Sequence, residues 1–249
     1  MIDTTQLNIE WITKVSKSNR NADRILVEKV IRSLLLLEGL VQVGLPFVFK
    51  GGTSLMLHFN SAKRLSIDID ILIAHRIKHL DETLRLVANM QGFSYVKPQQ
   101  RTTESDIEKA HYLFFYLPIH KTAKEEEYVL LDILFEEIGY TKIEERSIVS
   151  QFVPLKGNLL SVRVPCLDDL LGDKLTAFAP NTTGIPYYKG EDSMSMEIIK
   201  QLYDIGSLFD RSTNLKIVKE TFHRFARTEL AYRKARGRSS STSPKRTGS

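Results

Sequence analysis

The chain has 249 residues, 42% hydrophobic and 26% charged, the composition of an ordinary globular protein with room for one large domain or two small ones. Its most apolar stretch, residues 33–49, is interrupted by Glu38 and Gln42, so we expect no membrane-spanning helix. The opening residues show no basic patch followed by an apolar run, and a single cysteine, Cys166, excludes an internal disulfide. We therefore expect a cytoplasmic protein without a secretory signal.

The net charge of +5 is concentrated near the C-terminal end. Residues 233–249 contain no acidic residue and six basic ones: Arg233, Lys234, Arg236, Arg238, Lys245 and Arg246. Subtracting these six from 35 leaves 29 basic residues against 30 acidic ones, so the rest of the chain is nearly neutral, at −1. We expect residues 233–249 to form a disordered tail. Docking of this basic, Ser-rich tail on RNA or DNA phosphates is the alternative.

Helix and strand patterns are mixed through the first two thirds of the chain. Apolar residues at helical spacing predict a helix over residues 23–40, and alternating isoleucines predict a strand over residues 66–73. Similar patterns predict helices at 54–59 and 77–90, and strands at 46–50, 93–96, 112–117, 128–135 and 160–164.

After Pro165 the pattern becomes helical. Helices are predicted over residues 167–178, 194–209 and 214–232, separated by a loop at 180–193 and a turn at 210–213. The fold class is therefore α/β (α+β), with a mixed sheet and flanking helices followed by a C-terminal helical bundle. We expect a helical segment over residues 1–40 packed on the core, an α/β domain over 41–165, the bundle over 166–232 and the tail over 233–249.

A glycine turn, Lys50-Gly51-Gly52-Thr53-Ser54, lies between a predicted strand and a predicted helix. Two glycines allow the backbone to turn sharply and to approach a ligand closely. The N-terminus of the next helix favours phosphate, and the Thr53 and Ser54 hydroxyls could add donors. The sequence matches neither a Walker A loop nor a dinucleotide fingerprint, and by itself it is also compatible with a plain turn.

Two carboxylates, Asp68 and Asp70, occupy positions i and i+2 of the predicted strand over residues 66–73, with Ile69 between them. Their side chains therefore point to the same face, with Cα atoms roughly 6.5–7 Å apart, and they repel each other unless a cation intervenes. A solvated acidic face is the alternative, although Leu72 continues the same row in apolar form. Oxygen ligands of this kind suit Mg²⁺ or Mn²⁺ rather than zinc.

A third carboxylate, Asp132, interrupts an apolar strand and has Leu130 and Leu134 on its own face. Burying an unpaired carboxylate costs several kcal/mol, so Asp132 requires a cationic partner. A structural salt bridge would satisfy it. Beside the Asp68–Asp70 strand, a third metal ligand is the interpretation that we favour.

The order of these features is more specific than any one of them. A Gly-Gly-Thr-Ser turn, an Asp-x-Asp strand and a lone strand aspartate form the pattern of the nucleotidyltransferase superfamily. Together with later residues, the chain resembles one branch closely, the AbiEii family of toxins from type IV-style toxin–antitoxin and phage-defence systems. The matching blocks are residues 50–55, 64–70, 171–178 and 200–205, and the resemblance covers roughly residues 40–210.

The resemblance implies roles for residues that the pattern alone leaves open. Lys174 matches the family's helical lysine, expected to reach nucleotide phosphates, and Asp204 matches its late catalytic aspartate. Arg64 and Ser66 join Gly51, Gly52, Thr53 and Ser54 as expected nucleotide-binding residues. From the residues themselves, Lys174 could be a solvated helix lysine, and Asp204 could pair with Lys200, four residues earlier.

The expected activity is metal-dependent transfer of a nucleotidyl group from a nucleoside triphosphate. Asp68, Asp70 and Asp132 would hold Mg²⁺ or Mn²⁺, and catalysis would also involve Lys174 and Asp204. The resemblance implies an RNA acceptor such as a tRNA 3′ end, with a protein acceptor as the alternative, and a possible cognate antitoxin. A non-catalytic nucleotide- or partner-binding module and a metal-dependent nuclease are the rival interpretations.

Overall fold

The computed structural model describes residues 1–60, 64–99, 108–120 and 124–239, and it divides into two compact units. The sheet unit comprises Met1–Arg101, Lys109–Ile138 and Ile143–Pro165. The helical unit comprises Thr102–Glu108, Gly139–Lys142 and Cys166–Ser249.

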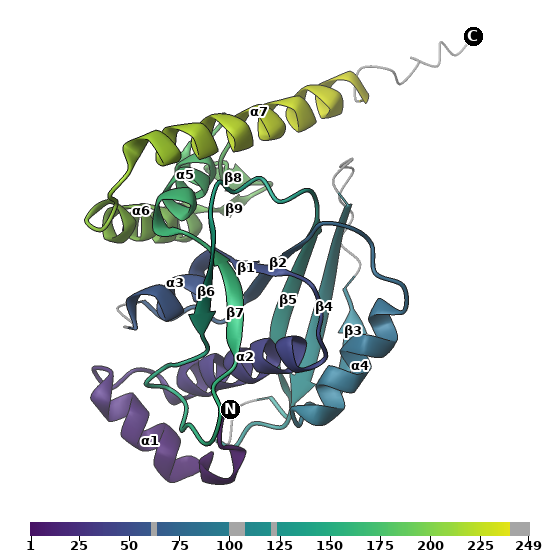
Figure 1. The fold of residues 1–249 in the computed structure, drawn as a ribbon, viewed down its shortest axis with the longest axis vertical. Coiled ribbons are helices and arrows are strands. Elements are labelled where there is room, and N and C mark those ends of the chain that lie inside the picture. Colours follow the sequence, from purple (N-terminus) through teal and green to yellow (C-terminus); the bar gives the residue numbers. More distant parts are fainter. Residues whose placement is uncertain (61–63, 100–107, 121–123, 240–249) are drawn as a thin grey trace. The chain divides into compact units, whose positions relative to one another are not determined.

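A five-stranded mixed sheet forms the centre of the sheet unit (Figure 1). Its strands lie in the order β1 (Val48–Lys50), β2 (Ile69–Ile73), β5 (Glu127–Phe135), β4 (Glu108–Tyr116) and β3 (Tyr95–Pro98). Strand β2 runs parallel to β5 and antiparallel to β1, and β3 runs antiparallel to β4. The isoleucines that predicted β2, at positions 69, 71 and 73, are all buried, so one face of the strand belongs to the core.

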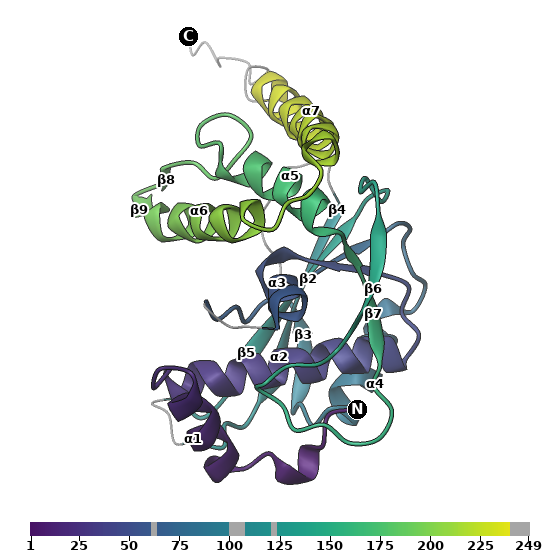
Figure 2. The ribbon, with the colours of Figure 1, turned by 60° about the vertical axis from the view of Figure 1, so that its left-hand side comes forward.

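Helix α2 (Arg24–Gln42) contributes a large part of that core, because nearly all of its residues from Val27 to Leu40 are buried. The Asp23 side chain caps it by accepting hydrogen bonds from the amides of Ile25 and Leu26. The helix packs against α1 (Ile9–Ser18), α4 (Leu80–Met90) and β5, and Figure 2 shows it lying across the strands. A short 3₁₀ helix, η1 (Thr4–Gln6), precedes α1.

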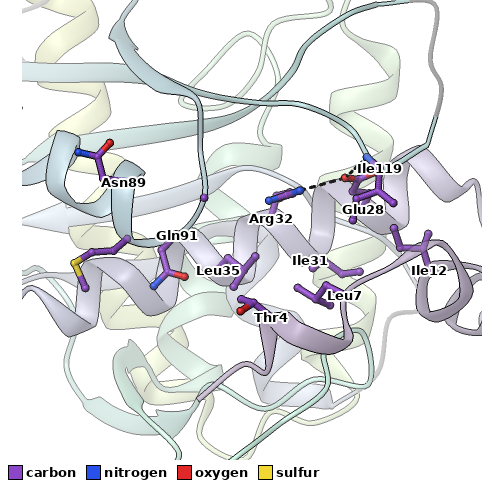
Figure 3. Close-up of a pocket in the computed structure, with 12 residues that line it drawn as sticks. Thr4, Leu7, Ile12, Glu28, Ile31, Arg32, Leu35, Asn89, Gln91 and Ile119 are labelled. Atoms are coloured by element: carbon purple, nitrogen blue, oxygen red, sulfur yellow. Dashed lines mark hydrogen bonds and ion pairs between the residues drawn. The ribbon is translucent and has the colours of Figure 1, made fainter.

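A buried charged pair on α2 borders a cavity of about 300 Å³ in this unit (Figure 3). The Glu28 carboxylate accepts hydrogen bonds from the Ile119 amide, 2.9 and 3.1 Å from its two oxygens, and lies 3.5 Å from the Arg32 guanidinium. The same guanidinium lies 4.8 Å from the centre of the Tyr116 ring. Glu28 therefore fastens the segment after β4 to α2.

A second ladder, formed by β6 (Ile143–Ser147) and β7 (Ser161–Pro165), contacts β1 and helix α3 (Gly51–Phe59). His58 of α3, the histidine nearest the glycine turn in sequence, has both ring nitrogens buried. Burial, reinforced by the charge of Arg146 on β6, lowers the pKa of His58 from 6.5 to about 4. The half-buried His58 is therefore neutral at physiological pH.

Three helices build the helical unit: α5 (Leu167–Phe178), α6 (Ser195–Phe209) and α7 (Leu215–Ser239). α5 contacts both α6 and α7, and a two-stranded hairpin, β8 (Tyr188–Lys189) with β9 (Asp192–Ser193), precedes α6. Buried Asp169 accepts hydrogen bonds from the amides of Thr141 and Lys142, from the Thr221 hydroxyl and from the Cys166 thiol. This one carboxylate ties the start of α5 to α7 and to the 139–142 segment.

The fold class predicted from the sequence is confirmed, and most elements lie within a few residues of their expected positions. The larger differences are at element ends: α3 starts three residues and β4 four residues earlier than expected, and β2 and α4 each start three residues later. Helix α7 continues seven residues past 232, to Ser239. The strand β6 was not predicted, since three of its five residues are charged. Of the expected tail, residues 240–249 lie outside the described residues.

The length and polarity of the described helices bear on whether any of them could span a membrane. Among the described residues, each helix is either too short or too polar to cross a lipid bilayer.

The half-buried His58 predicts a loss of stability in mild acid. Because the folded-state pKa is lowered, the stabilising effect is complete above the unfolded-state pKa of 6.5 and is lost as pH falls towards 4. Between pH 7 and pH 5 the loss amounts to about 2 kcal/mol. In urea unfolding, His58→Leu should lack this part of the pH dependence, whereas the control His79→Asn, at an exposed histidine, should keep it. Equal pH dependence in wild type and His58→Leu would contradict the assignment.

Candidate active site

The pairing of β2 with β5 places two of the predicted carboxylates side by side. In this parallel ladder Asp70 is the partner of Asp132, so both side chains point to the same face of the sheet. The Asp132 side chain is 28% exposed and Asp70 is half-buried, so both are accessible without lying in bulk solvent. Two carboxylates in this position repel each other and favour a cation between them.

The two aspartates belong to a polar row that crosses the whole sheet. Lys50 of β1 pairs with Asp70, and His111 of β4 lies with its Nδ1 2.5 Å from Oδ1 of Asp132. On the far side, the amide of Gln99 donates a hydrogen bond to the carbonyl of His111. One polar residue at or beside each of the five strands therefore lines up at the same level of the sheet.

The glycine turn packs directly against this row. Gly51 has a φ of +78°, in the left-handed region, and a Cβ added there would lie 2.7 Å from Cγ of Asp70. A Cβ on Gly52 would lie 2.8 Å from Oγ of Ser66 and would also overlap the Arg64 guanidinium. The two glycines thus bring the first turn of α3, whose N-terminus has no side-chain cap, against Asp70, Arg64 and Ser66.

The Thr53 and Ser54 hydroxyls have partners within the protein. The Thr53 hydroxyl donates to the carbonyl oxygen of Asp68 over 2.6 Å, and the Ser54 hydroxyl donates to that of Gly51 over 2.8 Å. Both residues are completely buried. The Thr53 hydroxyl fastens the turn to the segment before β2, and the Ser54 hydroxyl closes a bond within the turn itself. The part of both hydroxyls in phosphate binding stays a prediction.

Asp68 lies just before β2 and is exposed. Among the residues that the structure describes, no three His, Cys, Asp or Glu side chains are gathered closely enough to hold a metal ion. The donors that the ladder brings together are Asp70 and Asp132, and their oxygens suit a hard divalent cation. The part of Asp68 in metal binding stays a prediction.

Lys174 and Asp204 form an ion pair inside the helical unit. Nζ of Lys174 on α5 lies 3.0 Å from Oδ2 of Asp204 on α6, and it donates a hydrogen bond to Oε1 of Gln201 over 2.9 Å. The two side chains are 11% and 4% exposed. Lys174 is therefore not a solvated helix lysine, and the cation beside Asp204 is not Lys200, which instead lies 4.0 Å from Glu197.

A comparison with protein-family models decides the relationship. The model described as nucleotidyl transferase AbiEii toxin of a type IV toxin–antitoxin system matches residues 35–247. The chain belongs to the AbiEii family. Membership confirms the resemblance derived from the glycine turn and the later blocks, and it implies a cognate antitoxin as a partner.

Two solved structures are similar to this AbiEii-family chain at low identity. JHP933 from Helicobacter pylori is 17% identical, with a TM-score of 0.40, covering 86% of this chain and 94% of its own. An antigenic nucleotidyltransferase-like protein from Paracoccidioides brasiliensis is 12% identical, with a TM-score of 0.42, covering 82% of this chain and 92% of its own. The comparison with curated proteins gives no match. The family model alone therefore carries the assignment.

Sequence analysis of this AbiEii-family protein missed His111. It belongs to no metal-ligand motif, and 21 residues separate it from Asp132. The sequence held only a weak signal for it. His111 is a polar residue directly before the apolar run 112–116, and strand alternation places it on the face opposite the buried Tyr112, Phe114 and Tyr116.

The Lys174–Asp204 pair predicts a large stability difference between single and double variants. Lys174→Met leaves the Asp204 carboxylate buried without its cation and should cost about 3–5 kcal/mol of unfolding free energy in urea titration. Lys174→Met/Asp204→Leu removes both charges and should recover most of that loss. The control Lys200→Met, from the exposed pair with Glu197, should cost less than about 1 kcal/mol. A double variant as unstable as the single one would show that the two charges are not coupled.

Proposed function

We propose that this protein transfers a nucleotidyl group from a nucleoside triphosphate to an RNA hydroxyl, such as a tRNA 3′ end, in a reaction that requires Mg²⁺ or Mn²⁺. The observation that carries the proposal is the pairing of Asp70 with Asp132 on one face of the sheet, directly against the glycine turn. Family membership supports the reaction class. We further propose that it acts in the cytoplasm, where nucleoside triphosphates and tRNA are available.

The divalent cation would be held by Asp70 and Asp132, with Asp68 as a further ligand. When bound, it would neutralise triphosphate charge and make the acceptor hydroxyl more acidic. All of these donors are carboxylate oxygens, which suits magnesium and manganese better than zinc. The half-buried position of Asp70 and Asp132 strengthens their attraction for a cation relative to bulk water.

The residues around Gly51 would hold the triphosphate. The first turn of α3 offers backbone N–H groups and the positive end of a helix dipole, and Arg64 adds a guanidinium beside Gly52. These groups stabilise negative charge as the acceptor oxygen attacks the α-phosphorus and pyrophosphate leaves. Lys174 and Asp204 enter the proposal through their match to the family blocks.

Incubation with each α-³²P-labelled nucleoside triphosphate, Mg²⁺ and total RNA tests this function. Label entering a tRNA-sized band, and lost in chelator, is the expected result. Cleaved RNA without label would indicate a nuclease, and label entering protein would indicate a protein acceptor. Bound but unreacted nucleotide would indicate a binding module. Each of these three results would overturn the proposed reaction.

Replacement of Asp70 or Asp132 by asparagine should abolish both metal binding and toxicity. Each exchange keeps the side-chain shape but removes a charge that holds the cation. Mg²⁺ at a hundred times its Kd should stabilise the wild type by about 2.7 kcal/mol, measured as a rise in Tm over the value in chelator, and should not stabilise either variant. Growth inhibition on expression should be relieved in both variants.

The control is Glu10→Gln, which makes the same charge change at an exposed position of α1. It should respond to Mg²⁺ and inhibit growth as the wild type does. Undiminished toxicity from a well-folded Asp70→Asn variant would rule out metal-dependent transfer as the cause of growth inhibition.

A further inference from the structure

His111 and Asp132 make a close polar contact within the row described above. Nδ1 of His111 lies 2.5 Å from Oδ1 of Asp132, and the two side chains are 11% and 28% exposed. In the tautomer that carries its proton on Nδ1, the imidazole donates this hydrogen bond to the Asp132 carboxylate. The bond occupies one oxygen of Asp132 and leaves Oδ2 to face other partners.

The backbone holds the imidazole in this position. His111 lies in β4, next to β5, and its carbonyl accepts a hydrogen bond from the Gln99 amide over 2.7 Å. The following residues alternate between buried Tyr112, Phe114 and Tyr116 and half-buried Leu113 and Phe115, which places His111 on the Asp132 face. Two adjacent strands therefore fix both ends of the hydrogen bond.

We propose that His111 is a positioning residue that orients the Asp132 carboxylate for the divalent cation. The inference rests on the proposed function, because it assigns Asp132 to metal binding. By fixing Oδ1, the imidazole limits rotation of the carboxylate and directs Oδ2 towards the side of the sheet that Asp132 shares with Asp70. Groups that hydrogen-bond to metal ligands in this way typically contribute 10–100-fold to metal affinity.

The position of the donor atom provides a selective test. Nδ1 of histidine is bonded to Cγ, and the amide nitrogen of asparagine is also bonded to Cγ, so His111→Asn keeps a donor at nearly the same place. The amide nitrogen of glutamine is one bond farther from the backbone, so His111→Gln moves the donor, and His111→Ala removes it. A positioning role predicts that these three variants differ in metal affinity in this order.

The experiment is a calorimetric titration of Mn²⁺ into wild type, His111→Asn, His111→Gln and His111→Ala, with Tm measured in chelator for each. We expect His111→Ala to bind Mn²⁺ about 10–100-fold more weakly, His111→Asn to remain within a few-fold of the wild type, and His111→Gln to lie between them. Excess Mn²⁺ should restore transfer activity to His111→Ala, because the ligand is misdirected rather than lost.

Two outcomes would overturn the inference and leave the proposed function intact. One is a His111→Ala variant that binds Mn²⁺ as tightly as the wild type. The other is an equal loss of Mn²⁺ affinity in His111→Asn and His111→Ala when both melt at the wild-type temperature in chelator. A wild type that binds no Mn²⁺ would instead overturn the proposed function, and this inference with it.

Discussion

The register between β2 and β5 is the constraint on which the candidate active site depends. It sets Asp70 beside Asp132, and the repulsion between two neighbouring carboxylates must be offset by positive charge or hydrogen-bond donors. Three groups around the carboxylates can offset this repulsion: Lys50 on the adjoining strand, the N-terminus of α3 against Asp70, and the imidazole of His111 against Asp132. A shift of one residue in this register would send one carboxylate into the core and break the whole arrangement.

In the helical unit, a buried carboxylate is neutralised by an ion pair with a lysine. Lys174 and Asp204 neutralise each other at 3.0 Å, with Gln201 as an additional acceptor for the ammonium group. Such a pair is costly to break and contributes little as a whole compared with apolar residues of the same volume. The Lys174 ammonium group, 11% exposed, is therefore held between two partners, the Asp204 carboxylate and the Gln201 side-chain oxygen.

Local patterns in the sequence were sufficient for most helices and strands, although not for β6, and they were insufficient for the contacts between elements. Apolar residues at helical spacing located α2, and the isoleucine alternation located β2. The pairing of Asp70 with Asp132 depends on which strands become neighbours, and no local pattern specifies that. For the same reason His111 was missed, and so was the pairing of Lys174 with Asp204. The bond of the Thr53 hydroxyl to the Asp68 carbonyl was not foreseen either, because these two groups, 15 residues apart, become neighbours only on folding.

The environment of Cys166 has a practical consequence. Burial raises the pKa of its thiol to about 11, and its Sγ donates to the Asp169 carboxylate. At neutral pH the thiolate fraction is then on the order of one in ten thousand, and maleimides and similar reagents react with thiolates. The protein can therefore be labelled at a cysteine introduced on its surface while the native one stays in place. Fluorophores or spin labels attached in this way would report ligand binding without disturbing the Asp169 contacts that hold α5 and α7 together.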